Sequence, residues 1–287
     1  HGAYARVGNQ EMLTAALRAV VGRFGLRGEV LGDVVAGAVM KHSSQWSLAR
    51  ECALGSGLTP ETPAFDLQRA CGTSLETAII LGTKIALGQI DSGIAAGVDT
   101  ASDAPIGVSE GLRRLMLRSA RGRDAVARLK PWLGLRPKHL KPNLPQVVEP
   151  RTGLSMGQSC ELMAGRWQVG REAQDQLALE SHRRAAAAYE EGFYGDLVIG
   201  YRGLREDDNL RRDTSLERLA KLKPAFPMDG SATLTAGNST PMTDGASAVL
   251  LASEEWARER DLPVLAYLTH GKVAAVDFVR GEGLLMA

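Results

Sequence analysis

The sequence predicts an α/β fold with a buried sheet, and three observations support this prediction. Short apolar runs typical of buried strands alternate with longer amphipathic stretches typical of helices. The chain is 44% hydrophobic and 23% charged, a composition typical of folded globular chains rather than disordered ones. The length of 287 residues allows one large domain or two smaller ones, at about 100–200 residues per domain.

The first hundred residues alternate between helices and strands. A helix is expected over residues 8–26, with Asn9 as its N-cap and Gly25 at its end, because apolar residues recur at helical spacing between them. The other elements expected in this part are a helix at 46–57, a long helix that follows Cys71-Gly72-Thr73-Ser74 and runs to Leu87, and strands at 30–39, 64–70 and 90–98. This order of strands and helices favours a layered fold with a buried sheet.

The second half of the chain continues the pattern after a loop-rich middle, in which prolines are frequent. The elements expected there are helices at 171–191, 214–222 and 254–260 and strands at 245–253 and 264–269.

Residues 111–142 carry most of the charge asymmetry. They contain ten Lys or Arg residues and one acid, Asp124, while the whole chain has a net charge of +1. Three interpretations stay open: a solvated face paired with acids elsewhere, a surface for an anionic membrane or long-chain acyl-CoA, and a docking surface for a partner subunit. Nucleic acid is not an expected partner, because no recognition motif accompanies the charge.

Cysteine and histidine usage predicts a cytoplasmic protein without a metal site. The three cysteines have neither a paired framework nor zinc-ligand spacing, and the five histidines are scattered. No apolar run approaches the length of about 18 residues that a transmembrane helix needs, and no signal peptide is recognised.

Cys71 is the candidate nucleophile. It lies between an expected strand and an expected helix, where the helix dipole and unpaired amides favour a thiolate. Gly72 leaves room for a substrate to approach the sulfur. The alternative is a buried structural cysteine, which is the interpretation given to Cys52 and Cys160.

Two further segments have both a functional and a structural interpretation. Residues 153–157 match the pattern of a hydrolase nucleophile elbow around Ser155, but a proline-rich connection precedes them instead of a buried strand. Residues 235–246 are small, polar and glycine-bearing, which suits either a tight turn or a backbone that approaches a ligand closely.

Four segments in order resemble the thiolase family of acyl-CoA C-acyltransferases. They are QRACGTSLETAIILGTKIALGQIDSGIAAGVDTASDAP at 68–105, the Ser-Met-Gly at 155–157, LERLAKLKPAF at 216–226 and TAGNSTPMTDGASAVLL at 235–251. The basic insertion, with SDAPIGVSEGLRRLML and LKPNLP, is most similar to the thiolase subunit of the trifunctional fatty-acid oxidation complex.

The resemblance implies the layered α/β/α thiolase fold and a division of the chain. Residues 1–110 would be the N-terminal half, 111–234 the loop domain with the basic insertion, 235–262 the return to the N-terminal half, and 263–287 the start of the C-terminal half. Most of that last half and a first strand before His1 would be absent, so these residues are expected to be part of a longer polypeptide. A homodimer or a dimer of dimers is expected, through a sheet edge of the first half.

The resemblance also implies a reaction. Cys71 would take the acyl group of a 3-ketoacyl-CoA as a thioester, and a second CoA would release a shortened acyl-CoA, or the Claisen condensation would run in reverse. CoA is a substrate, and no cofactor is implied. The residues implied to contact CoA are Met156, Arg211, Ala236, Gly237 and Thr240. Fatty-acid β-oxidation, with a hydratase–dehydrogenase partner subunit, would be the context.

The sequence departs from the family where the thiol would be activated. The 287 residues contain no GHP histidine motif, no N/H-E-A-F motif and no second cysteine in a C-x-G-x-G motif. The nucleophile is therefore present without its base. Two alternatives to a thiolase stay open: a ketoacyl synthase that takes acyl carrier protein, and a non-catalytic thiolase-like lipid carrier or scaffold subunit.

Overall fold

The structure is a computed structural model that describes residues 2–226, 228 and 232–282. Of the predicted segments, 1–110, 111–234 and 263–287 therefore extend in part outside the described residues. The chain divides into two compact units, one formed by residues 104–146 and the other by the rest of the chain. The domain boundaries inferred from the sequence stay a prediction.

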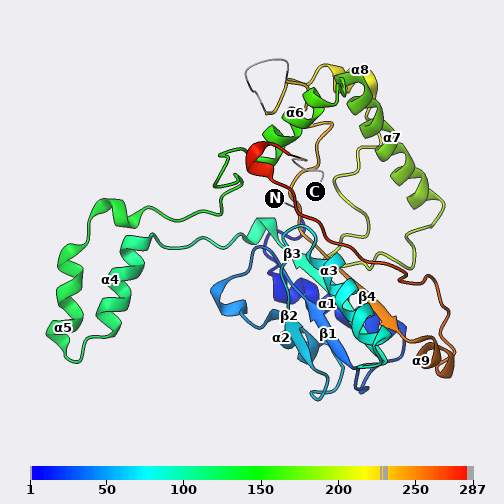
Figure 1. Ribbon diagram of the computed structural model, residues 1–287, viewed down its shortest axis with the longest axis horizontal. Coiled ribbons are helices and arrows are strands. Elements are labelled where there is room, and N and C mark those ends of the chain that lie inside the picture. The colour runs from blue at the N-terminus through cyan, green and yellow to red at the C-terminus, as the bar shows by residue number, and fades with distance from the viewer. Residues whose placement is uncertain (1, 227, 229–231, 283–287) are drawn as a thin grey trace. The chain divides into compact units, whose positions relative to one another are not determined.

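A four-stranded mixed sheet lies at the centre of the larger unit, with the strand order β2-β1-β3-β4 (Figure 1). The central strands β1 (Asp33–Ala36) and β3 (Ser92–Asp99) run parallel to each other, and β2 (Ala64–Asp66) joins β1 in parallel. The fourth strand, β4 (Gly245–Ala252), pairs antiparallel with β3, so that Gly245 lies opposite Asp99.

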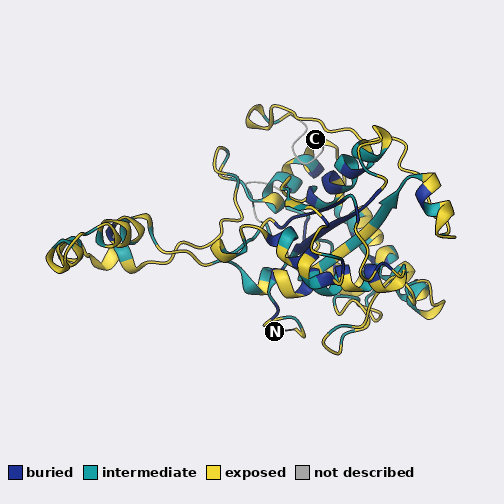
Figure 2. Cartoon of the chain, turned by 90° about the horizontal axis from the view of Figure 1, so that it is seen from below, coloured by how far each residue is buried: buried dark blue, intermediate teal, exposed yellow. Residues whose placement is uncertain are grey.

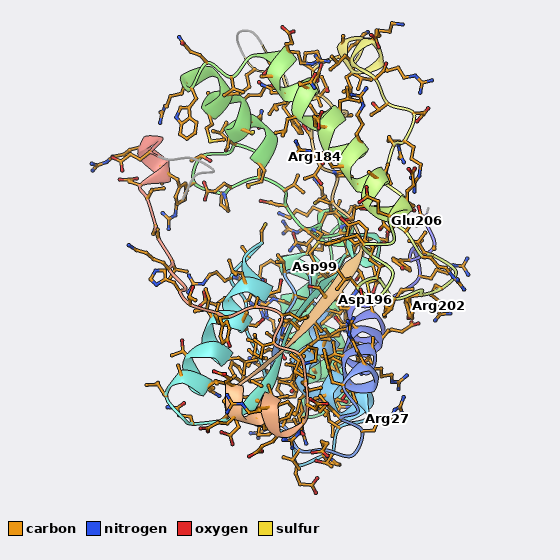
Figure 3. The ribbon with its side chains drawn as sticks, turned by 90° about the vertical axis from the view of Figure 1, so that its right-hand side faces the viewer. Arg27, Asp99, Arg184, Asp196, Arg202 and Glu206 are labelled. Carbon is orange, nitrogen blue, oxygen red and sulfur yellow. The ribbon has the colours of Figure 1, made fainter. Side chains whose placement is uncertain are left out.

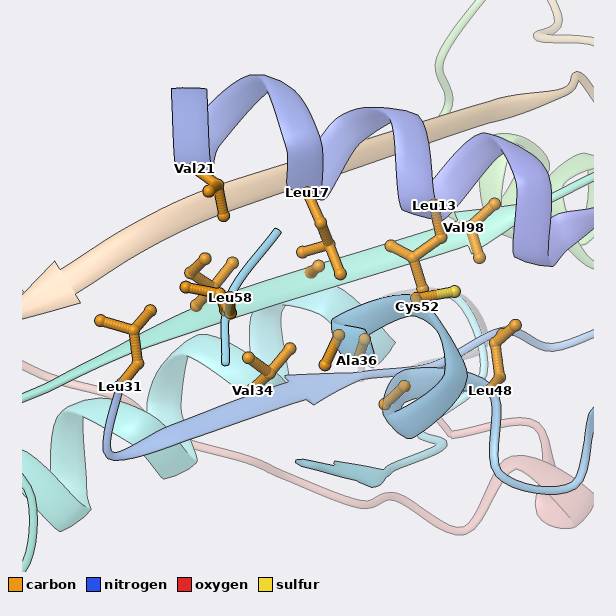
Figure 4. Packing of buried hydrophobic residues seen from close by; sticks show 14 of the residues in the cluster. Leu13, Leu17, Val21, Leu31, Val34, Ala36, Leu48, Cys52, Leu58 and Val98 are labelled. Atoms are coloured by element: carbon orange, nitrogen blue, oxygen red, sulfur yellow. The ribbon is translucent and has the colours of Figure 1, made fainter. Parts of the chain in front are cut away.

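Helices cover both faces of this sheet, as the sequence predicts. On one face, α1 (Asn9–Arg23) and α2 (Leu48–Ser56) pack against β1 and β3 around the apolar cluster drawn in Figure 4. On the other face, Leu81 of α3 (Thr73–Ala86) packs against Val35 and Ala95. Alternation along the strands explains the division, because successive side chains point to opposite faces. The expected α/β/α layering is confirmed.

The start of α1 differs from the prediction. Gly8 is the N-cap, and Asn9 is the first helical residue. The Asn9 side chain is fully buried, donates to the Met40 carbonyl over 2.7 Å and accepts from the Thr100 hydroxyl over 2.8 Å. Its polar atoms therefore join the loops that follow β1 and β3 rather than cap the helix. The end of α1 is as predicted, with Gly25 at a φ of +66°.

Two strand predictions are corrected. The strand predicted at 64–70 ends at Asp66, because the chain then bends into the turn before α3. The strand predicted at 264–269 is wrong: this exposed segment has no regular secondary structure. A side chain added at Gly82 of α3 would lie 2.2 Å from Leu268, so the segment passes along α3 instead of pairing with the sheet.

Four further helices belong to the larger unit: α6 (Met156–Arg166), α7 (Arg171–Glu190), α8 (Leu216–Ala220) and α9 (Glu254–Glu259). Short 3₁₀ turns lie at Ser43–Gln45 (η1), Ala101–Asp103 (η2) and Phe278–Arg280 (η5). Arg171 joins α7 to α8 by donating to the Leu222 carbonyl over 3.3 Å and also to that of Leu219, while it pairs with Asp175 of its own helix.

The smaller unit is helical and open. It contains α4 (Glu110–Ala120), α5 (Ala125–Leu129), η3 (Lys130–Gly134) and η4 (Pro137–Leu140). Leu115 is the one buried hydrophobic side chain in residues 104–146, all of which the structure describes. Figure 2 shows this unit mostly in the yellow and teal of exposed and intermediate residues. Among the described residues, none of the helices is both long and apolar enough to cross a membrane.

Candidate active site

Cys71 lies in a tight turn between β2 and α3, as the sequence predicts, and its side chain is exposed. Thr73 holds the turn together: its hydroxyl accepts from the Arg69 N–H over 2.9 Å and donates to the Ala70 carbonyl over 2.7 Å. The Gly72 N–H also donates to the Arg69 carbonyl, over 2.9 Å. The thiol is thus presented outward, one residue before the Gly72 N-cap of α3.

The residue before the thiol has a strained backbone. Ala70 has a φ of +42°, in the left-handed region that residues other than glycine rarely adopt. Such conformations cost about 1–3 kcal/mol and persist where surrounding contacts enforce them. Here the enforcing contacts are the Thr73 hydroxyl and an ion pair of 2.9 Å between Arg69 Nε and Glu76 Oε2, which joins the turn to the buried first turn of α3.

A cleft of about 360 Å³ opens beside the thiol. Its lining comes from the turn, from the ends of β1 and β3 and from the start of β4: Gly37, Ala70, Cys71, Thr73, Ser74, Gly97, Val98, Asp99, Gly245, Ala246 and Ser247. Two of these positions exclude any side chain, because an added Cβ would lie 1.8 Å from the Leu67 carbonyl at Gly37 and 2.8 Å from the Ser74 Cβ at Gly97. Absent side chains therefore allow these segments to pack closely around the cleft.

Asp99 fixes one wall of the cleft. Its carboxylate, which lies at the end of β3 (Figure 3), accepts from the Val39 N–H over 3.0 Å and from the Met40 N–H over 2.8 Å. The loop after β1 is thereby tied to the end of β3. Asp99 belongs to none of the site residues predicted from the sequence, and an acidic residue directly after a buried strand is the signal that could have found it.

The other two cysteines do not share this setting. Cys52 is buried in α2, and burial raises the pKa of its thiol to about 11. Burial, together with the neighbouring charge of Glu161, also raises the pKa of Cys160 on α6. Both groups therefore favour the protonated thiol over the nucleophilic thiolate at neutral pH.

The residues implied to contact CoA lie around the helices α6, α7 and α8 and do not line the Cys71 cleft. Met156 is the exposed first residue of α6. The neighbouring Ser155 is the N-cap of that helix and accepts from the Gln158 N–H over 3.2 Å, so it is a capping residue rather than a hydrolase nucleophile. Arg211 lies beside α7, where its backbone N–H donates to His182 Nδ1 over 3.3 Å.

Residues 235–240 form a polar turn packed against α7 and α8. The Asn238 side chain accepts from the Thr235 N–H over 2.7 Å and donates to Asp175 over 2.9 Å. A Cβ added to Gly237 would lie 2.6 Å from Leu219 of α8, so this glycine packs directly against that helix. Ala236 and Thr240 are exposed. The hydrogen-bonded turn at 235–240 agrees with the structural interpretation, and residues 245 and 246 line the Cys71 cleft. The close approach to a ligand stays a prediction.

Glu161, which is not among the site residues predicted from the sequence, supports this turn from α6. Its buried carboxylate accepts from the Leu234 N–H over 2.7 Å, from the Thr233 N–H over 2.9 Å and from the Thr233 hydroxyl over 3.1 Å. Because the partners are 72 and 73 residues apart, no local pattern in the sequence could have joined them. Among the described residues, no group of three or more His, Cys, Asp or Glu side chains is arranged to hold a metal ion.

The thiol-bearing turn, the layered sheet and the cleft together match a known class. The family described as Thiolase, N-terminal domain, matches residues 1–255, so this chain belongs to the thiolase family. Two curated relatives are 3-ketoacyl-CoA thiolases of Yersinia pestis (strain Pestoides F) and Yersinia pseudotuberculosis serotype O:1b (strain IP 31758). Each is 39% identical over 264 residues, which cover 90% of this chain and 60% of the relative. The chain thus spans about 60% of the length of these relatives.

Solved structures give the same assignment. The acetyl-CoA acetyltransferase of Bacillus anthracis superposes with a TM-score of 0.73, and human mitochondrial 3-ketoacyl-CoA thiolase, solved in complex with CoA, with 0.74. Both are 27% identical and cover 91% of this chain, which corresponds to 64% and 63% of their own lengths. The thiolase fold predicted from the sequence is confirmed.

Proposed function

We propose that Cys71 is the nucleophile of an acyl transfer that cleaves a 3-ketoacyl-CoA with CoA, or runs the reverse condensation. The observation that supports this most directly is the exposed thiol beside the glycine-lined cleft. The position of Cys71 directly before α3 adds to it, since the positive end of the helix dipole favours an oxyanion that develops beside the thiol.

The proposed chemistry has two steps. The Cys71 thiolate attacks the C3 carbonyl of the substrate, and the C2–C3 bond breaks, leaving its electron pair on the acetyl-CoA fragment. That fragment takes up the proton that Cys71 lost and leaves, while the rest of the substrate stays as a thioester. A second CoA then attacks the thioester as its thiolate, and its proton returns to the Cys71 sulfur.

The substrate and the partners follow from the same proposal. Among the described residues, the 235–240 turn, Met156 and Arg211 are the groups proposed to contact CoA, next to helices α6, α7 and α8. The 3-ketoacyl-CoA thiolase relatives support CoA thioesters as substrates, and β-oxidation, the homodimer and the hydratase–dehydrogenase partner remain proposals.

Turnover of acetoacetyl-CoA and of a longer 3-ketoacyl-CoA with free CoA, measured on the full natural polypeptide that carries these residues, tests the nucleophile. The Cys71→Ala variant should lose ketoacyl cleavage down to background, because the thioester cannot form. Cys160→Ala should keep the wild-type rate, since this thiol lies outside the cleft. An unchanged rate in Cys71→Ala would rule out the residue, and transfer only to acyl carrier protein would favour a ketoacyl synthase.

A further inference from the structure

Asp175 is a buried acid of α7 that takes no part in the proposed chemistry. Only 4% of the residue is exposed, and its two carboxylate oxygens have different partners. Oδ2 accepts from Arg171 Nε over 2.6 Å, and Oδ1 accepts from the Asn238 amide over 2.9 Å. A buried carboxylate destabilises a fold unless it is paired and hydrogen-bonded, and here the two partners come from different segments of the chain. Asp175 therefore joins these segments.

On one side of Asp175, the connection leads to α8. The Arg171 guanidinium donates to the Leu222 carbonyl over 3.3 Å and also to the Leu219 carbonyl. Leu219 lies in α8 and Leu222 follows its end, and Gly237 packs against both side chains. Because the planar guanidinium has one acceptor in Asp175 and two at the end of α8, its orientation is fixed.

On the other side, the connection leads to the polar turn that contains Asn238. Its Oδ1 accepts from the N–H of the fully buried Thr235 over 2.7 Å. Paired with an arginine, the Asp175 carboxylate can only accept, so the Asn238 amide must turn its NH₂ group toward it. Two further acceptors, Gln174 Oε1 and the Thr233 carbonyl, lie 3.4 Å from the same NH₂ group. Asp175 thus selects the amide orientation whose oxygen closes the turn.

We infer that Asp175 is a positioning residue for CoA, which acts by holding the 235–240 turn and the end of α8 in one arrangement. The inference rests on the proposed function, in which this turn contacts CoA. Ala236 and Thr240 are exposed, so their own packing contributes little to the conformation of the turn. Asp175 does not line the Cys71 cleft, so it acts on CoA binding and leaves the thiol unchanged.

Two substitutions and their combination test the direction of these hydrogen bonds. Asp175→Asn keeps the size of the side chain but turns an NH₂ group toward one of two donors, Arg171 or Asn238. Asn238→Asp places two carboxylates against each other. In the double variant, the new amide accepts from Arg171 and donates to the new carboxylate, which still accepts from the Thr235 N–H. Every group in the connection then has a partner again.

Two other variants complete the set. Glu172→Gln is the matched control, because it removes one negative charge from an exposed position of the same helix. Asn238→Ala breaks the connection from the side of the turn and leaves the ion pair of Arg171 and Asp175 in place, so it tests the inference even if Asp175→Asn does not fold. Circular dichroism checks the folding of each variant.

The measurements are kcat, the KM for CoA and the rate of Cys71 alkylation, all on the full natural polypeptide. We expect each single change at Asp175 or Asn238 to raise the KM for CoA about tenfold or more, because a buried hydrogen bond to a charged group is lost. The kcat at saturating CoA and the alkylation rate should stay within about twofold of wild type, as for a loss of binding alone. The double variant should recover most of the affinity, and Glu172→Gln should match the wild type.

A wild-type KM in folded Asp175→Asn or in Asn238→Ala would overturn the inference and leave the proposed function standing. The same holds if the double variant binds CoA no better than the single variants, or if Cys71 alkylation falls in parallel, which would indicate a general change of the fold. If the wild-type polypeptide did not use CoA, the proposed function would fail and the inference with it.

Discussion

At the scale of single residues, the outward position of Cys71 depends on its neighbours in the turn. Arg69, Ala70 and Thr73 fix the backbone on either side, at the expense of a left-handed conformation at Ala70. Most cysteines are buried, because the thiol is weakly polar. A turn that keeps one exposed beside a cleft gives that thiol access to a bulky electrophile.

The three cysteines should differ sharply in alkylation. At neutral pH, iodoacetamide should label Cys71 first, Cys160 slowly and Cys52 last, because Cys52 is buried and its pKa is raised to about 11. The raised pKa means that the Cys52 thiolate becomes populated only in alkali, so its labelling should increase above pH 10–11 even if the protein stays folded. Peptide mass spectrometry measures each site. Preferential labelling of Cys160 over Cys71 would contradict this order.

The glycines at the cleft should tolerate no side chain. Gly97→Ala would place a Cβ 2.8 Å from Ser74, so we expect a loss of about 1–3 kcal/mol in the free energy of unfolding. Gly22→Ala is the matched control: this exposed position in α1 has free space around it, and the change should stabilise the helix by about 0.5–1 kcal/mol. Urea denaturation measures both. Similar effects of the two substitutions would show that space at Gly97 is not limiting.

Some of these residues could be predicted and others could not. Cys71 was found because its signal is local: a thiol between an apolar run and a helix. Asp99 and Glu161 depend on partners that are 59 to 73 residues away, and only the folded chain brings them together. At Asn9 a local signal was misleading: the residue type favours an N-cap, but its side chain hydrogen-bonds to Met40 and Thr100 inside the fold instead.

At the scale of elements, the strong predictions are those with a clear period or an end signal. Helices α1, α3 and α7 lie within a few residues of their predicted bounds, because their apolar spacing and terminal glycines act locally. The predicted strand at 264–269 failed because a strand also needs a partner. Its apolar residues instead follow α3, where Leu268 approaches Gly82 and Gly271 approaches Ile79.

Helix α6 should control the proposed CoA-contacting turn through Glu161. Glu161→Gln removes the negative charge and replaces one of the two acceptor oxygens near the Thr233 and Leu234 amides by an NH₂ donor, so we expect a loss of about 1.5–3 kcal/mol in stability and a raised KM for CoA. The rate of Cys71 alkylation should stay unchanged, because Glu161 does not line its cleft.

Glu180→Gln on α7 is the control for this experiment. Its carboxylate pairs with Arg184 at 3.2 Å on the surface, where such pairs contribute about 0–1 kcal/mol. If Glu161→Gln left both stability and the KM for CoA at the control values, the supporting role of α6 would be refuted.

At the scale of the whole molecule, the described part of the Cys71 cleft offers a nucleophile but no histidine that could act as its base. We therefore expect the 287-residue chain alone, with a mass of 30.6 kDa, to acylate slowly and to lack multiple turnover. Intact mass spectrometry of the active protein, purified from its natural source, compares its mass with the 30.6 kDa of the 287-residue chain. An active species of 30.6 kDa with full turnover would show that no further groups are required.

The net charge of this chain is close to zero because its two units carry opposite net charges. Residues 104–146 hold ten of the 34 basic residues and only two of the 33 acids, which leaves 24 basic and 31 acidic residues for the rest. The isoelectric point near 7.9 therefore describes neither unit. If proteolysis separated them at neutral pH, the helical piece would be retained by a cation exchanger and the remainder by an anion exchanger. Ionic strength should then affect the behaviour of the intact chain much more than its net charge suggests.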